Sequence, residues 1–492
     1  MNRTFRTIAI LPALAVFLLV TVFCTNAAAP AASGEIDLSA LDAYILAQMD
    51  KHGLRGVSLA VTRGNEIIYL QGYGTTGGDR PMTPQTPMYI GSLSKSFTAM
   101  AVAQLIVTGR IDPDAPVINY IPWFHVSDAE ATQRITVNHF LHHTSGLSEA
   151  GFTVVLTDDA SDEDAVRALA SAELTAPVGT TLQYFNTGYA VLAVVIEQVS
   201  GMPYEQYLQE NIFTPLDMCC TYTDPEPARL NGLSQGYSRF FGFTVPAPQP
   251  HRVYEVGAGY IISTAEDMAH YAITLNNEGN YHGMSIIAPE GMAMLFRPVN
   301  GYGMGWHVSP DHFWHGGANE TFRTSVELYP SRELGIVLLI NQGYMLDHYI
   351  SGPQLLAGVQ DIVLGRNPPS VETGPSVRTI GFGMLAFSLG LCVLHTFNFL
   401  KLRTWRIRTQ TWSRAKTAWD VAVSFIIPSV ILFVVFTQVQ SFLGTRFNWT
   451  YQMVIMARTL PDITVIMVLG SIPDYVQGFI KLFWALARKN TH

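Results

Sequence analysis

The sequence predicts an exported α+β domain, with an antiparallel sheet flanked by helices and a largely helical subdomain, followed by C-terminal transmembrane helices. Three observations support this prediction. A basic and then apolar segment opens the chain, strand patterns lie at both ends of residues 34–366 with helical patterns between them, and long apolar runs close the chain. The chain of 492 residues is also too long for one compact domain.

The N-terminal segment has the layout of a secretory signal peptide. Arg3 and Arg6 precede an apolar run over residues 8–23, and three alanines follow at 27–29. A basic start, an apolar stretch and small residues are the three parts of such a peptide. We therefore predict a signal peptide over residues 1–29 and export of the region that follows.

Residues 34–366 begin with a helix and a hairpin. Residues 38–49 place their apolar side chains on one helical face, which predicts an amphipathic helix. Residues 56–74 then alternate around a turn at 63–66, which is typical of a β-hairpin. From the helix that begins near Ser92 to about residue 288, the domain is expected to be a mixture of loops and helices.

The end of the same domain returns to strands. Residues 322–330 and 334–341 predict a second strand pair, and residues 351–364 predict a last helix. We expect one sheet to be assembled from both ends of the domain, with helices packed against it.

The C-terminal region predicts a membrane segment. A proline-rich linker at 367–377 leads into residues 378–492, which contain apolar runs at 379–400, 419–443 and 463–486. Each run is near the length of about 20 residues that spans a bilayer, so we predict about three transmembrane helices.

The charges between the first two runs predict the orientation in the membrane. Six basic residues lie there: Lys401, Arg403, Arg406, Arg408, Arg414 and Lys416. By the positive-inside rule this loop is cytoplasmic, which places the preceding domain outside. The chain is therefore expected to be a multi-pass protein of the cell membrane with an extracytoplasmic domain.

Composition excludes several kinds of partner and cofactor. A net charge of −9, without a basic stripe outside the membrane region, argues against nucleic acid. Of the four cysteines, only the vicinal pair Cys219-Cys220 lies in the exported domain, and that pair would close a strained ring. Adjacent His142 and His143 point in different directions, and no other cluster has ligand spacing, so we predict neither metal nor cofactor. The expected partners are a lipid bilayer and a small-molecule or peptide substrate, and the oligomeric state stays open.

The most informative motif is Ser92-Leu93-Ser94-Lys95. Residues three apart share one face of a helix, so the Lys95 ammonium can reach the Ser92 hydroxyl. A serine needs an adjacent base to become a nucleophile, and a desolvated lysine can supply it. By itself the motif is short, and most such pairs are helix surface.

Two further segments place polar groups at turns. Tyr184 and Asn186 lie two residues apart at the entrance of a helix that ends at Gly201, and the simplest interpretation of this pair is an aromatic and amide cap. His315 is followed by two glycines that let a backbone approach a ligand, and the amide of Ala318 can then donate to an oxyanion. The alternative for that segment is a glycine-rich turn with an exposed histidine.

In this order the three motifs resemble those of the serine β-lactamase and penicillin-binding protein superfamily. The similarity also includes the segments 135–137, 143–147, 212–216, 263–268 and 302–306, and so covers essentially all of the exported domain. It is strongest to the branch of class C β-lactamases, D-aminopeptidases and esterases, some of which carry C-terminal membrane helices. The resemblance implies a β-lactamase/transpeptidase-like fold.

The resemblance also implies roles for the motif residues. Ser92 would attack a carbonyl, Lys95 would take its proton, and Tyr184 would relay protons to the leaving group and to water. Asn186 would orient Lys95 and the substrate, while the amides of Ser92 and Ala318 would form the oxyanion hole beside His315 and Gly317.

One residue departs from the family pattern. His315 stands where true β-lactamases and transpeptidases carry a lysine, and a histidine is mostly neutral at pH 7. The fixed charge that attracts a substrate carboxylate is therefore weakened.

We accordingly expect an extracytoplasmic serine hydrolase that forms an acyl-enzyme and cleaves amide or ester bonds of cell-envelope peptides or small esters. One alternative is a β-lactamase or DD-carboxypeptidase. A second alternative is a non-catalytic penicillin-binding sensor domain, because Asp474 in the third span is costly in a bilayer unless it is paired.

Overall fold

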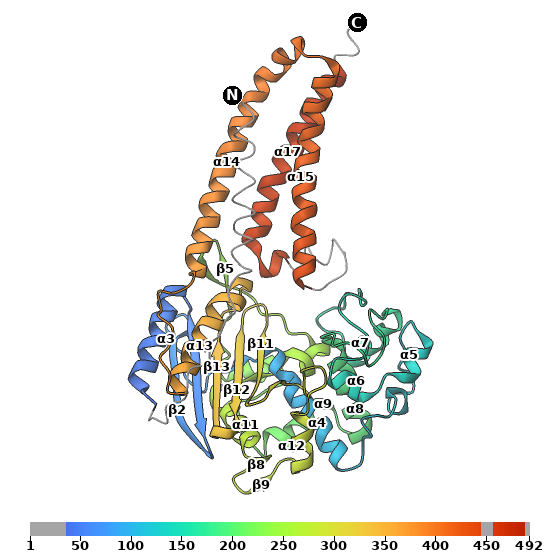
Figure 1. The fold of residues 1–492 in the computed structure, drawn as a ribbon, viewed down its shortest axis with the longest axis vertical. Coiled ribbons are helices and arrows are strands. Elements are labelled where there is room, and N and C mark those ends of the chain that lie inside the picture. The colour runs from blue at the N-terminus through green and yellow to red at the C-terminus, as the bar shows by residue number, and fades with distance from the viewer. Residues whose placement is uncertain (1–35, 444–455, 488–492) are drawn as a thin grey trace.

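The computed structural model describes residues 36–443 and 456–487, so the predicted signal peptide lies outside the described residues. Figure 1 shows a domain built around a sheet, with long helices extending from one side of it. The first helix of the domain is α3 (Leu38–His52) and the last is α13 (Gly352–Val363), as the sequence predicted.

The central sheet has seven antiparallel strands and joins the two ends of the domain. Strands β1 and β13 pair in the middle, with Val57 opposite Ile340 and Ala60 opposite Val337. This confirms that both predicted strand pairs belong to one sheet. Across the sheet the strands are β10 (His307–Ser309), β11 (His312–Ala318), β12 (Arg323–Tyr329), β13 (Leu334–Ile340), β1 (Gly56–Arg63), β2 (Glu66–Gly77) and β3 (Arg80–Pro81).

Helices cover both faces of this sheet. Val57, Leu59 and Val61 of β1 belong to an apolar cluster with α3 and α13, whereas Ala60 points into the larger core on the other side. Side chains alternate across a strand, so a strand buried on both faces must be apolar throughout. The sequence of β13 has this character, and all of its residues are buried.

The larger core joins the sheet to a helical subdomain. Helices α11 (Ala265–Asn276) and α4 (Ser94–Val107) contribute to it together with α8 (Thr187–Ser200). Gly201, with a φ of +75°, ends α8 where the sequence predicts. The other helices are α5 (Ala129–Arg134), α6 (Val137–Leu141), α7 (Asp162–Ala168), α9 (Tyr204–Leu208), α10 (Pro225–Leu230) and α12 (Pro289–Leu295).

The predicted mixture of loops and helices also contains short strands that the sequence patterns did not indicate. Two of these pairs are hairpins, β5 (Tyr237–Phe240) with β6 (Phe243–Pro246), and β8 (Asn280–Tyr281) with β9 (Met284–Ser285). The third pair joins β4 (Met88–Tyr89) to β7 (Ile262–Ser263). Strands of two to four residues are too short to show a clear alternation.

Three C-terminal helices are long and apolar enough to cross a membrane: α14 (Val377–Arg408), α15 (Arg414–Leu443) and α17 (Pro461–Ala487). They contain the three predicted spans. Helix α17 continues through Pro473, and the Asp474 carboxylate lies 3.6 Å from the His395 ring nitrogen of α14. Asp474, whose charge would be costly in a bilayer without a partner, therefore faces a neighbouring helix.

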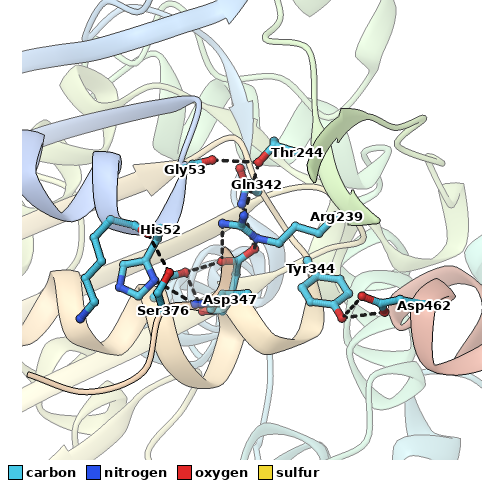
Figure 2. Close-up of polar contacts among 12 residues, drawn as sticks. His52, Gly53, Arg239, Thr244, Gln342, Tyr344, Asp347, Ser376 and Asp462 are labelled. Atoms are coloured by element: carbon cyan, nitrogen blue, oxygen red, sulfur yellow. Dashed lines mark hydrogen bonds and ion pairs between the residues drawn. The ribbon is translucent and has the colours of Figure 1, made fainter. Parts of the chain in front are cut away.

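Buried polar contacts attach these helices to the domain (Figure 2). The Arg239 guanidinium of β5 donates two hydrogen bonds, of 2.7 and 3.0 Å, to the Asp347 carboxylate, and both side chains are at most 1% exposed. Gln342 donates to the same carboxylate. Close by, the Tyr344 hydroxyl donates to Asp462, in the first turn of α17, at 2.7 Å. The domain and the third helix thus share a dry polar contact.

Helix α14 is attached to the domain in a similar way. The Ser376 hydroxyl caps α14 and donates to the Lys51 carbonyl at the end of α3. The amide of Val377 donates to the buried His52 ring, and the hydroxyl of Thr244 donates to the Gly53 carbonyl. Helix α14 therefore begins directly against the domain.

Candidate active site

Two glycines allow the Ser92 turn to pack against the edge of β11. Ser92 lies in a short 3-10 turn, Gly91–Leu93, immediately before α4. Gly91 has a φ of +57°, and a Cβ atom there would lie 2.4 Å from the Ala318 amide nitrogen. A Cβ atom on Gly317 would lie 1.8 Å from the Ile90 carbonyl oxygen. Only glycine fits both positions, and the result is that Ser92 and the Ala318 amide are neighbours.

Lys95 lies one helical turn after Ser92 and is fully buried. Its Nζ is 3.3 Å from the Ser92 Oγ, 2.7 Å from the Asn186 Oδ1 and 2.6 Å from the Ala258 carbonyl oxygen. Burial lowers the pKa of Lys95 to about 7. A neutral amine would give its two hydrogens to Asn186 and Ala258, which leaves its lone pair for the proton of Ser92.

The segment before α8 brings Tyr184 and Asn186 to the same place. The Tyr184 ring lies 4.7 Å from the Lys95 Nζ, and the Tyr184 hydroxyl forms a hydrogen bond with the Ser92 side chain. Burial raises the pKa of Tyr184 above its ordinary value, so the phenol keeps its proton at neutral pH. The structure thus brings together Ser92, Lys95, Tyr184 and Asn186, as the sequence predicted.

His143 holds this segment in position. It adopts a φ of +54°, and its Nδ1 accepts a hydrogen bond from the Phe185 amide at 3.2 Å. Its ring lies 4.3 Å from the ring of Tyr184. Burial lowers the pKa of His143 well below its ordinary value, so the imidazole is neutral. His143, in the segment 143–147 that resembles the family, therefore supports the site and does not take part in a metal cluster among the described residues.

His315 lies at the same edge of the sheet, with its ring engaged inside the protein. Its Nε2 is 3.1 Å from the Tyr302 hydroxyl, and its Nδ1 is 2.7 Å from the Gly316 carbonyl oxygen. Burial, and then the nearby Lys95 charge, lower the pKa of His315 to about 3. The side chain is neutral at physiological pH, so β11 offers no fixed positive charge to a substrate.

Two glutamates near Lys95 were not identified by the sequence motifs. The Glu149 carboxylate accepts a hydrogen bond from the Asn186 amide at 3.1 Å, and its pKa is raised to about 7 by burial and then by Glu255. Burial also raises the pKa of Glu255, against the opposing effect of Arg252. Glu149 lies two residues after the family-like segment 143–147, which is the one local signal that could have found it.

The site offers the groups for acyl transfer and, in the part of the chain that the structure describes, nothing suited to a metal. Residues 36–443 and 456–487 contain no group of three or more His, Cys, Asp or Glu side chains arranged to hold an ion. A hydroxyl beside a desolvated amine can attack a carbonyl carbon, and two adjacent amides can stabilise the negative charge that forms on the oxygen. The protonated phenol can relay protons.

Comparison with known proteins agrees with this chemistry. A family model described as Beta-lactamase matches residues 41–359. Protein flp of Staphylococcus aureus (strain MW2) is 23% identical over 378 residues, which is 75% of each chain. Unguisins hydrolase ungD' of Aspergillus campestris is 28% identical over 326 residues, or 60% of each chain.

Solved structures share the fold. A penicillin-binding protein homologue from Pyrococcus abyssi superposes with a TM-score of 0.59 at 24% identity, over 68% of this chain and 79% of that one. A class C beta-lactamase from Rhodobacter sphaeroides gives 0.54 at 21% identity, over 65% and 99% of the two chains. The hydrolase EstCE1 gives the same score and identity, over 67% and 98%. Residues 41–359 have the β-lactamase/transpeptidase-like fold, and the chain belongs to the beta-lactamase family of serine hydrolases.

Proposed function

We propose that this chain is a membrane-bound serine hydrolase that acts outside the cytoplasm, through an acyl-enzyme on Ser92, on ester or amide bonds of cell-envelope peptides or small esters. The observation that supports it best is the position of Lys95. Its amine is desolvated, has a pKa of about 7, and lies 3.3 Å from the Ser92 hydroxyl.

The first step is acylation. Neutral Lys95 takes the proton of Ser92 as the Ser92 Oγ bonds to the substrate carbonyl carbon. The negative charge on the carbonyl oxygen is stabilised by the amides of Ser92 and Ala318, which are fixed by the packing of Gly91 on β11. The alcohol or amine then leaves with a proton supplied through Tyr184.

Deacylation uses the same groups in the reverse direction. Water attacks the acyl carbon and gives its proton to Lys95 through Tyr184. Lys95 then returns a proton to the Ser92 Oγ as the bond to the acyl carbon breaks and the acid product leaves. The protonated phenol suits such a relay because it can donate one hydrogen and accept another. Asn186 keeps Lys95 in place through the 2.7 Å hydrogen bond.

The membrane orientation rests on charge and on the shape of the molecule. The six basic residues between 401 and 416 lie in the last turns of α14 and the first turn of α15. Figure 1 places the junction of these two helices at the end of the long helices that is far from the domain. The positive-inside rule assigns that end to the cytoplasm. The catalytic domain then lies on the opposite side.

The neutral His315 favours esterase or peptidase activity over β-lactamase or carboxypeptidase activity. The substrates of β-lactamases and carboxypeptidases carry a carboxylate, which a cation on β11 would attract. His315 is uncharged because its pKa is lowered to about 3.

Hydrolysis of a short-chain ester by the full chain tests the proposal. Ser92→Ala should lower the rate by about a thousandfold or more, since it removes the nucleophile. Ser171→Ala removes an exposed serine outside the site and should leave the rate unchanged. Equal rates for Ser92→Ala and the unmodified chain would contradict the proposal.

A further inference from the structure

A short series of contacts connects the active site to the long helices. The Ala318 amide of the site begins the turn between β11 and β12, and this turn packs on Gly343, where a Cβ atom would lie 2.6 Å from the Asn319 carbonyl oxygen. The next residue, Tyr344, donates to Asp462 in the first turn of α17. Few residues therefore separate the oxyanion hole from the end of a predicted membrane span.

Polar contacts join the domain to the long helices. The Tyr344–Asp462 hydrogen bond holds the domain on α17, beside the buried Arg239–Asp347 ion pair within the domain, as Figure 2 shows. The Ser376 cap holds it on α14. The site cannot turn away from the bilayer surface without the loss of these contacts.

The hairpin of β5 and β6 extends the apolar surface of the membrane helices onto the domain. Phe240 and Phe243, on either side of its tip, are 42% and 55% exposed. The ring of Phe243 lies 5.2 Å from that of Phe382 in α14, and Gly242 packs on the backbone of the same helix. Exposed apolar side chains beside a predicted spanning helix can enter the boundary between lipid headgroups and acyl chains.

A loop that leaves the site carries exposed apolar residues. The loop at 150–160 leaves the site at Glu149, where Phe152 packs on Phe185, and then exposes Val155, whose surface is 78% accessible. Val253 is 44% exposed, and its amide donates to the Asp158 carbonyl of that loop. Figure 1 draws α7, which follows the loop, in the upper part of the domain, toward the long helices.

We propose that the substrate is an amphiphile of the outer leaflet, whose ester or amide carbonyl reaches Ser92 while its apolar chain passes over the exposed side chains of Val155 and Val253. This inference rests on the proposed function and on the proposed orientation. The neutral His315 suits it, because a lipid-like ester needs no carboxylate. Ser92 takes the acyl group as the alcohol or amine leaves with a proton, and water then releases the acid.

The test uses the full chain in phosphatidylcholine nanodiscs and two esters of one fluorophore. A butyrate ester is added in solution, and a palmitate ester is dissolved in the bilayer. The readout is the ratio of the palmitate rate to the butyrate rate. In Val155→Ser/Val253→Ser we expect this ratio to fall about tenfold, because two apolar contacts are lost.

The matched control is Met284→Ser. Met284 is 54% exposed on β9, which Figure 1 places at the end of the domain farthest from the long helices. The ratio of the palmitate rate to the butyrate rate in Met284→Ser should equal that of the unmodified chain. A ratio that falls equally in this control, or does not fall in the valine variant, would overturn the inference.

Two other outcomes separate this inference from the proposed function. If the unmodified chain cleaves the butyrate but not the bilayer-borne palmitate, the substrate class is wrong and the hydrolase stands. If it cleaves neither ester and Ser92 reacts with no fluorophosphonate, both are wrong.

Discussion

The pKa of Lys95 gives a quantitative prediction for the reaction of Ser92. With a pKa of about 7, about one-tenth of Lys95 is neutral at pH 6, half at pH 7 and about nine-tenths at pH 8. If neutral Lys95 is the base, the second-order rate of labelling by a fluorophosphonate should rise about tenfold from pH 6 to pH 8.

Glu149→Gln tests the electrostatic origin of this value. Burial lowers the pKa of Lys95, and the negative charges of Glu255 and then Glu149 raise it. Removing one of these charges leaves Lys95 easier to deprotonate, so the midpoint of the pH profile should move below 7. Glutamine can still accept the hydrogen bond of the Asn186 amide, which preserves the geometry.

The shape of the profile should change as well. The pKa of Glu149 is itself raised to about 7, so in the unmodified chain the two groups titrate over the same range and the profile reports the pair. Glu149→Gln leaves one titrating group. Glu130→Gln, at an exposed site, serves as the control. A flat profile between pH 6 and 8, or a midpoint that stays at 7 or rises in Glu149→Gln, would refute this reasoning.

Three further predictions follow from the same structure. A reporter fused near Arg408 should be cytoplasmic and one near Ser370 should be outside; both on one side would refute the first span. His315→Lys should improve affinity for carboxylate-bearing β-lactams by about tenfold relative to uncharged esters, whereas a uniform loss of activity would mean that His315 only fills space. Asp347→Asn leaves a guanidinium buried without its counter-ion and should lower the free energy of unfolding by about 3–5 kcal/mol. Denaturant titrations measure this free energy. The control Glu130→Gln should change the free energy of unfolding by less than about 1 kcal/mol, since the Glu130–Arg134 ion pair is exposed. Equal stability of Asp347→Asn and the unmodified chain would contradict the role of the buried pair.

The proximity of the candidate catalytic groups could be predicted from sequence because these groups are close along the chain or lie in short motifs. Ser92 and Lys95 are one helical turn apart, and Tyr184 and Asn186 share one helix entrance. The sheet could be predicted because its strands are long enough to show their pattern, as in β1 and β13.

The other features depend on contacts between distant parts of the chain. The raised pKa of Glu149 arises from burial beside Glu255, and no local pattern predicts that proximity. The Tyr344–Asp462 bond joins residues 118 positions apart. The hairpin of β5 and β6 has strands of four residues in a stretch rich in glycine and proline, where alternation is too brief to detect.

The most direct test of the account is the location of the covalent adduct. The full chain is treated with a fluorophosphonate and, separately, with a penicillin, and the modified residue is identified by peptide mapping and mass spectrometry. The account predicts a single fluorophosphonate adduct on Ser92, absent from Ser92→Ala and formed far more slowly in Lys95→Ala, and weaker modification of the same residue by the penicillin. A fluorophosphonate adduct on any other residue, or one that forms undiminished in Ser92→Ala, would contradict it.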